Sequence, residues 1–266
     1  MSITPDQFGP WAFVTGASSG IGREFAHQIA DAGINVVLVA RRLAVLQDLG
    51  AELAQRYGVD YRALGVDLSD PGMLAPIAEA TNDIDVGLLV SNAGAALPGP
   101  FLASDLQAQR AILRLNTATH LGLTHHFGER LARRGRGGIV LVSALGAIHG
   151  VPYMAHTAAT KAYITSLGAG LHVELAKRGV HVTVLHPGPT RTPALADLGL
   201  DPDRMPISPM PPDDWAREAL RALARNRASC IPGRINRLTA ALAPPAFTRS
   251  VMARMLLRPS QVNAHG

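Results

Sequence analysis

The chain has 266 residues, of which 47% are hydrophobic and 17% are charged. This size and composition fit one α/β domain with a full core and require no second domain. No apolar run reaches the roughly 18 residues that a membrane-spanning helix needs. The N-terminus has no basic segment followed by an apolar one, so we expect no secretory signal and a cytoplasmic location. A single cysteine, Cys230, excludes an intramolecular disulfide and fits that location.

The formal net charge of +5 raises the question of nucleic-acid binding. The arginines are scattered along the chain, and aromatic residues make up only 5% of it, too few for a base-stacking platform. We therefore expect no nucleic-acid partner. We also expect no metal site.

Short apolar runs alternate with amphipathic stretches along the chain. The expected strands are Trp11–Thr15, Asn35–Ala40, Tyr61–Val66, Val86–Ser91, Gly138–Ser143, His181–His186 and a short one at Ala228–Ile231. The expected helices are Ile21–Ala32, Leu43–Tyr57, Met73–Thr81, Leu106–Arg133, Ala158–Arg178 and Asp213–Arg225, with Asp213 near the N-cap of the last. Runs that are apolar on both faces fit parallel strands covered by helices. The alternation predicts an α/β Rossmann fold, a single-domain doubly wound parallel sheet of about seven strands with helices on both faces.

The periodic pattern loosens after Pro187. Residues 189–212 hold many prolines and few periodic apolar residues, which predicts a loop over a substrate site. A helical tail is expected over residues 235–258, with one apolar face made by Phe247, Val251 and Met255. One interpretation is a helix packed on the body or on a partner subunit. The other is a basic amphipathic helix that rests on a membrane surface.

A glycine-rich loop stands between the first expected strand and the helix that follows it. Glycines let the backbone turn sharply and approach a pyrophosphate closely, and the N-terminus of the helix offers free N–H groups and a positive dipole end. At the start of a βαβ unit, this arrangement is typical of dinucleotide-binding sites. The residues expected to contact the dinucleotide are Gly16, Ser18, Ser19, Gly20, Ile21 and Gly22.

Two arginines, Arg41 and Arg42, follow the second expected strand. An acidic residue at this place holds the ribose 2′-hydroxyl of NAD. A carboxylate would repel a 2′-phosphate, whereas arginine binds one through paired, charge-assisted hydrogen bonds. The alternative is two solvated arginines at a helix start, where the helix dipole disfavours them. The sequence therefore predicts NADP(H) as the cofactor.

The segment Ser143–Tyr163 resembles the catalytic segment of the short-chain dehydrogenase/reductase family, in which a serine precedes a Tyr-x-x-x-Lys pair. The glycine loop, Asp67-Leu68, the segment Ser91–Gly94 with serine in place of the motif's first asparagine, and Pro187–Thr192 resemble the family's other motifs. The resemblance covers essentially the whole chain. It implies further cofactor contacts from Asp67, Leu68, Asn92, Ala93, Gly94, Lys161, Pro187, Gly188, Thr190 and Thr192.

The same resemblance implies an oxidoreductase that interconverts a carbonyl and an alcohol. Hydride transfer to a carbonyl leaves an oxyanion that a positioned acid must protonate. In the family a tyrosine gives the proton, a serine binds the substrate oxygen, an asparagine holds a relay water and a lysine lowers the pKa of the tyrosine. By resemblance, the last three roles belong to Ser143, Asn116 and Lys161. The position of the tyrosine, four residues before Lys161, holds Thr157.

Thr157 cannot replace a tyrosine directly, because an aliphatic hydroxyl is a far weaker acid than a phenol and its side chain is shorter. Three explanations are open. Either Tyr153 or His156 is a relocated acid, atypical for the family. Alternatively, the chain binds the cofactor without redox turnover, as a sensor, a scaffold or a non-redox cyclase, lyase or isomerase. In the third explanation, an engineered Tyr-to-Thr change was made in an active reductase.

The resemblance also suggests a substrate and an assembly. Leu145, Val151, Tyr153 and His156 are expected to line the pocket together with the 189–212 loop, which predicts a small, fairly apolar substrate. Members of the family usually self-associate through their long helices. A homodimer or homotetramer is therefore expected, formed through Leu106–Arg133 and Ala158–Arg178.

Overall fold

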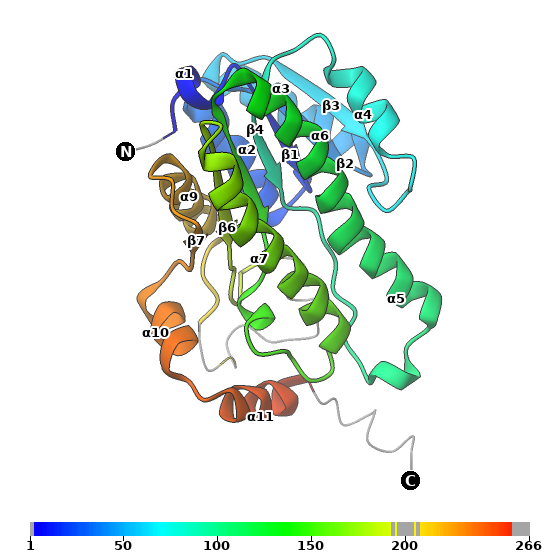
Figure 1. Ribbon diagram of the computed structural model, residues 1–266. Coiled ribbons are helices and arrows are strands. Elements are labelled where there is room, and N and C mark those ends of the chain that lie inside the picture. The colour runs from blue at the N-terminus through cyan, green and yellow to red at the C-terminus, as the bar shows by residue number, and fades with distance from the viewer. Residues whose placement is uncertain (1–2, 193–194, 196–204, 206–207, 257–266) are drawn as a thin grey trace.

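A parallel sheet of seven strands organises the chain, and the computed structural model describes residues 3–192, 195, 205 and 208–256. The strand order is β3-β2-β1-β4-β5-β6-β7, and each neighbouring pair is parallel. The strands are β1 (Trp11–Thr15), β2 (Asn35–Ala40), β3 (Tyr61–Gly65), β4 (Val86–Ser91), β5 (Gly137–Val142), β6 (Val180–Leu185) and β7 (Ser229–Cys230). The predicted Rossmann fold is confirmed (Figure 1).

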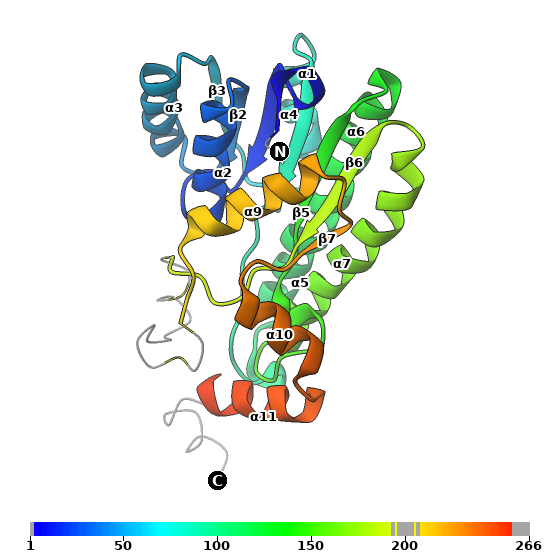
Figure 2. The ribbon, with the colours of Figure 1, turned by 90° about the vertical axis from the view of Figure 1, so that its left-hand side faces the viewer.

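Helices cover both faces of the sheet (Figure 2). One face is packed by α2 (Gly20–Asp31), α3 (Leu43–Tyr57) and α9 (Pro212–Ala224). The other is packed by α4 (Leu74–Thr81), α6 (Thr119–Arg134) and α7 (Ala155–Ala176). Successive strand residues alternate between the two apolar layers, as Ala12 and Phe13 do on β1. The sheet is therefore buried on both faces, as continuous apolar runs predict.

Most predicted helices agree with the structure to within three residues, but one expectation differs from it. The predicted helix Leu106–Arg133 is divided into α5 (Leu106–Leu113) and α6 by a π-helical turn, η2 (Arg114–Ala118). The prediction that Asp213 lies near an N-cap is confirmed, because Pro211 is the N-cap of α9 and Asp213 lies inside its first turn. There the carboxylate faces the positive end of the helix dipole, which is favourable without a capping bond.

Further helices lie outside the two layers that cover the sheet. They are α1 (Pro5–Phe8), the 3-10 turns η1 (Phe101–Ala103) and η3 (Leu145–Ala147), α10 (Arg234–Leu242) and α11 (Pro245–Leu256). The expected tail over 235–258 is thus two helices, and its last two residues lie outside the described ranges. The side of α11 that packs on the body carries Met252 and Leu256, whereas Phe247, a member of the predicted apolar face, is 64% exposed.

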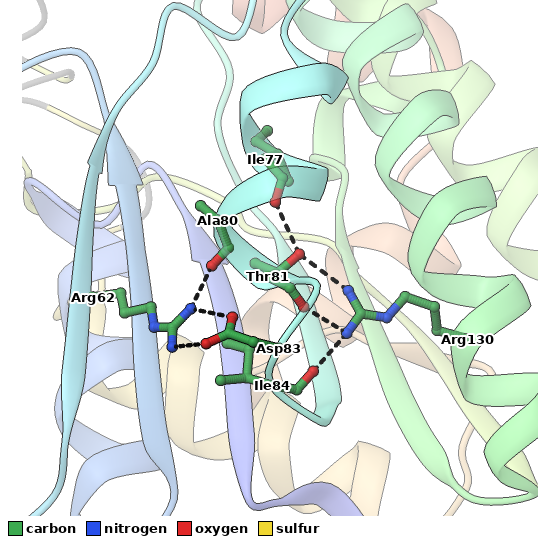
Figure 3. Close-up of polar contacts among 7 residues, drawn as sticks. All are labelled: Arg62, Ile77, Ala80, Thr81, Asp83, Ile84 and Arg130. Carbon is green, nitrogen blue, oxygen red and sulfur yellow. Dashed lines mark hydrogen bonds and ion pairs between the residues drawn. The ribbon is translucent and has the colours of Figure 1, made fainter.

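Two arginines on opposite sides hold the turn between α4 and β4 (Figure 3). Arg62 of β3 forms a bidentate ion pair with Asp83, with both N–O distances at 2.7 Å, and this pair lowers the pKa of the carboxyl to about 2. Arg130 of α6 donates to the hydroxyl and carbonyl oxygens of Thr81 and to the carbonyl of Ile84. These bonds satisfy carbonyls that the end of a helix leaves without intrahelical partners.

The single cysteine lies on the edge strand β7, where Cys230 is half-buried against the core. Burial raises the pKa of its thiol to about 12. The thiol is therefore protonated at neutral pH, and a protonated thiol is neither a nucleophile nor a metal ligand.

Candidate functional site

The strand order reverses between β1 and β4, so the carboxyl ends of these neighbours open onto diverging loops. Thr15, at the end of β1, ties the two loops together. Its hydroxyl donates to the Val90 carbonyl and accepts from the N–H groups of Asn92 and Ala93 at 2.8 and 3.0 Å. The Asn92 amide donates back to the Thr15 carbonyl at 3.0 Å. We call this set of bonds the Thr15–Asn92 clamp.

The glycine loop after β1 has a shape that only glycine permits. Gly16 and Gly20 have φ angles of +67° and +57°, in the left-handed region. A Cβ atom at Gly22 would lie 2.2 Å from the Gly16 carbonyl oxygen, so no side chain fits there. Ser19 is the N-cap of α2, yet its side chain makes no capping hydrogen bond. The first N–H groups of α2 are therefore available to an anion, as a pyrophosphate requires.

The ends of β2 and β3 place charged groups beside this loop. Arg42 donates from Nη2 to the Ser18 hydroxyl at 3.3 Å. The pKa of the Asp67 carboxyl is lowered, chiefly by hydrogen bonds from Ser69 and also by the charge of Arg41. Leu68, the residue after Asp67, is buried. The structure thus brings the two predicted arginines and Asp67 to the edge where the glycine loop lies.

A buried polar cluster joins the π-turn to α7. Asn116 of the π-turn is fully buried, and its amide group donates to the Ala95 carbonyl and to the Thr160 hydroxyl. Its Oδ1 atom accepts from the Ala95 N–H at 3.0 Å. Both amide protons are thus used within the protein, and Asn116 has a structural role here whatever else it does.

Lys161 lies in the same cluster and is 9% exposed. Its Nζ atom donates to the Val142 carbonyl at 2.9 Å, and burial lowers its pKa to about 8. A Cβ atom at Gly94 would lie 3.0 Å from Lys161 Nζ and 3.1 Å from Asn116 Oδ1. The predicted Gly94, Asn116 and Lys161 are therefore neighbours in space.

Ser143 comes close to α7, but its hydroxyl faces that helix. It donates to the Lys161 carbonyl at 2.7 Å and lies 2.8 Å from the Thr165 hydroxyl, and the residue is 3% exposed. The single hydroxyl proton of Ser143 is thus used in a contact with the helix backbone. In this arrangement it has no proton to offer a substrate oxygen.

Thr157 faces the loop after β4. Its hydroxyl accepts a hydrogen bond from the Leu97 N–H at 3.2 Å, and the residue is buried. Its neighbour His156 is bonded away from it: Nε2 lies 2.9 Å from the Gln109 carbonyl, to which it can only donate. His156 therefore links α7 to α5.

The predicted pocket residues lie on the segment before α7. Tyr153 has a φ angle of +61°, which is unusual for a residue with a side chain, and its carbonyl accepts from the Gly99 N–H at 2.8 Å. Its side chain packs with Val151 against Leu256 of α11. Leu145, in η3, donates its N–H to the Pro187 carbonyl at 2.7 Å.

The segment after β6 returns past the glycine loop. A Cβ atom at Gly20 would lie 3.1 Å from Thr192 Cγ2, and Thr190 forms a bridge with Met210. Gly188 approaches Asn236 of α10. Much of the predicted substrate loop 189–212, namely residues 193–194, 196–204 and 206–207, lies outside the described ranges.

His120 is a residue of this region that the sequence analysis missed. It is fully buried on α6, Ser91 donates to its Nδ1 atom at 2.8 Å, and its Nε2 atom donates to the Ala93 carbonyl. Burial, together with the charge of Lys161, lowers its pKa to about 3, so it is neutral. The serine in place of an asparagine at 91 was the available signal, since a hydroxyl needs a buried partner.

Comparisons with known proteins identify the class. A family model described as short chain dehydrogenase matches residues 10–203, and the chain belongs to this family. A 7β-hydroxysteroid dehydrogenase of Clostridium sardiniense is 30% identical over 233 residues, which cover 87% of this chain and 88% of that protein.

Two further proteins are similar to this chain. A short-chain dehydrogenase from Sphingobium yanoikuyae, solved in complex with NADPH, superposes with a TM-score of 0.80 at 30% identity, covering 97% of this chain and 99% of that one. A human protein named inactive hydroxysteroid dehydrogenase-like protein 1 is 33% identical over 184 residues, 68% of this chain and 56% of that protein.

The depressed pKa of Lys161 predicts a pH-dependent stability. The pKa is about 8 in the folded protein and 10.5 for the free side chain, so the unfolded chain binds the extra proton between these values. The free energy of unfolding of the wild type, compared with that of a Lys161→Met variant, should rise by about 3 kcal/mol from pH 8 to pH 10.5. This gain should disappear when the pH is lowered again. Urea unfolding of both proteins at the two pH values measures this difference. An identical pH dependence in the two proteins would contradict the buried ammonium.

Proposed function

We propose that this chain is a single-domain NADP(H)-dependent oxidoreductase that interconverts a carbonyl and an alcohol on a fairly apolar substrate in the cytoplasm. The observation that carries the proposal is the dinucleotide cradle, in which Gly22 leaves no room for a side chain below the uncapped start of α2. The relatives named as dehydrogenases and the NADPH complex of one of them support it.

The cofactor, when bound, would supply or accept the hydride. The cradle Gly16–Gly22 would hold its pyrophosphate, and Arg41 and Arg42 would hold the 2′-phosphate. The remaining contacts are proposed for Asp67, Leu68, Asn92, Ala93, Gly94, Lys161, Pro187, Gly188, Thr190 and Thr192.

The name of the hydroxysteroid relative supports an apolar substrate for this chain too. A steroid is larger than the small substrate that the sequence predicts, so the substrate panel needs both sizes. The apolar side chains of Leu145 and Val151 and the ring of Tyr153 would contact either one through dispersion and apolar burial.

We further propose that Thr157 takes the position of the proton-donating tyrosine and that the proton comes from Tyr153. Thr157 accepts from a backbone N–H and His156 donates to the Gln109 carbonyl, whereas Tyr153 supplies a phenol on the segment just before α7. The left-handed φ of Tyr153 costs conformational energy, and such strain is concentrated at functional sites.

A second candidate is a protein that binds NADP(H) without redox turnover. The Ser143 hydroxyl donates its proton to the Lys161 carbonyl, and the Thr157 hydroxyl, which accepts from the Leu97 N–H, is a far weaker acid than a phenol. The relative that is named inactive favours the same interpretation. Under it, the pocket would sense the nicotinamide, scaffold a partner or catalyse a non-redox cyclisation, elimination or isomerisation.

We propose self-association through the helices of the α4–α7 face. Large apolar side chains stay exposed there: Leu106 and Leu113 on α5, Leu121 on α6 and Val173 on α7. Burying them between copies would remove apolar surface from water. Light scattering should give the mass of a homodimer or homotetramer, and a monomeric mass at micromolar concentration would count against this contact.

Arg42→Ala should weaken NADPH binding and leave NADH binding unchanged, because only NADPH carries the 2′-phosphate. Loss of a charge-assisted contact predicts a rise in the NADPH Kd of roughly 10- to 100-fold. Titration of both nucleotides by fluorescence measures it. The matched control is Arg23→Ala, which removes an exposed arginine of α2 that forms an ion pair with Glu52 of α3. An equal loss for both nucleotides would show that Arg42 does not select the cofactor.

Two variants separate the candidate functions. If Tyr153 is the acid, wild type oxidises NADPH on a panel of small ketones and ketosteroids, and Tyr153→Phe lowers kcat about 100-fold or more with the NADPH Kd unchanged. If turnover is absent, wild type binds NADPH but consumes none. In both cases, and also if the threonine was engineered, Thr157→Tyr should raise the rate of reduction. Full activity in Tyr153→Phe would exclude that residue as the donor.

A further inference from the structure

The last two helices expose four large apolar side chains. Ile235, Leu238 and Leu242 stand at i, i+3 and i+7 on α10 and are 61–70% exposed, and Phe247 in the first turn of α11 is 64% exposed. We call these four residues the tail surface. Exposed large apolar residues that recur at helical spacing mark a contact with another apolar phase.

The opposite sides of the same helices are fixed to the body. Asn236 of α10 is buried, and its amide group donates to the Met210 sulfur at 3.2 Å and approaches Gly188. Met252 and Leu256 of α11 pack on Val151 and Ala158. Because other sides of α10 and α11 already pack on the body, the tail surface is the outward side of these helices.

The charge of the C-terminal part is one-sided. Residues 219–266 hold eight of the 25 lysines and arginines and none of the 20 acidic residues. Four of these arginines lie on the two helices and are exposed: Arg234, Arg237, Arg249 and Arg254. None of the four is in an ion pair with a carboxylate in the described ranges. The apolar surface thus has a basic border.

The helices lie at the end of the molecule where the substrate site is expected. Figures 1 and 2 both place α10 and α11 together at the lower end, beyond the carboxyl ends of the strands. The η1 turn, which precedes α5, lies at the same end in Figure 1 and carries Leu102, which is 95% exposed. The inward side of α11 contacts Tyr153, a predicted pocket residue.

We propose that the tail surface docks on an anionic lipid bilayer and places the substrate entrance at the membrane. The apolar side chains would enter the headgroup region, and the arginines would bind lipid phosphates. Among the described helices, none has the length and apolar content to cross a bilayer, so the contact is peripheral. A second copy of the chain fits this surface poorly, because a two-fold contact brings like-charged arginines together without carboxylates.

Sedimentation with vesicles tests the proposal. The full chain should bind vesicles of phosphatidylglycerol and phosphatidylcholine in equal parts, should not bind phosphatidylcholine alone, and should be released by high salt. Leu238→Ser/Phe247→Ser should lower the partition coefficient at least about tenfold, because two exposed apolar side chains are lost. Arg234→Gln/Arg237→Gln should also weaken binding and reduce its salt dependence.

The matched control is Leu43→Ser/Tyr61→Ser, which removes two exposed apolar residues from outside the tail surface and outside the proposed self-association surface. Its partition coefficient should stay within about twofold of wild type. NADPH titration of every variant shows that the fold is intact and keeps this test separate from the proposed activity. No binding to anionic vesicles, or an equal loss of binding in the control variant and in Leu238→Ser/Phe247→Ser, would overturn the proposal. So would a change of mass in solution, without loss of vesicle binding, in Leu238→Ser/Phe247→Ser.

Discussion

The Thr15–Asn92 clamp is the contact on which the site depends. In a doubly wound sheet, the chain leaves β1 toward one face and β4 toward the other, so the loops between them diverge. The Thr15 hydroxyl, which accepts two hydrogen bonds and donates one, links the two loops. The side-chain amide of Asn92 adds a further bond between them. The glycine loop is thereby held against Asn92, close enough that a Cβ atom at Gly16 or Gly22 would collide with the Asn92 amide.

Much of the fold could be predicted because burial on both faces leaves a clear sequence pattern. Strands β1, β2 and β4 have the predicted bounds, and the order of elements follows from strand–helix alternation. The break at Arg114–Ala118 could not be predicted, because apolar spacing hardly differs between a helix and one that contains a π-turn. The side of α11 that packs on the body could not be predicted, because it is set by Val151 and Ala158, which are distant in sequence.

Several residues proposed for the candidate site lie close together in the structure, but the orientations of their side chains could not be predicted. Gly94, Asn116 and Lys161 come together as the family resemblance implies. The direction of the Ser143 hydroxyl depends on a carbonyl of α7, and that of His156 on a carbonyl of α5. Spacing along a chain does not encode such contacts, since a side chain takes the nearest free partner in the folded packing. The result is a cluster of buried groups around Asn116, Ser143 and Lys161 whose hydrogen-bond partners lie within the protein.

Because the Cys230 thiol is unreactive, a second cysteine introduced at a chosen position can be labelled selectively. Because Cys230 is the one cysteine of the sequence and its pKa is raised to about 12, maleimide-type reagents find almost no thiolate in the native protein. A cysteine placed at an exposed position such as Ile235 would be the single fast-reacting group. A spin label or environment-sensitive dye attached there would report the depth and polarity at the C-terminal helices without a cysteine-free background having to be made first.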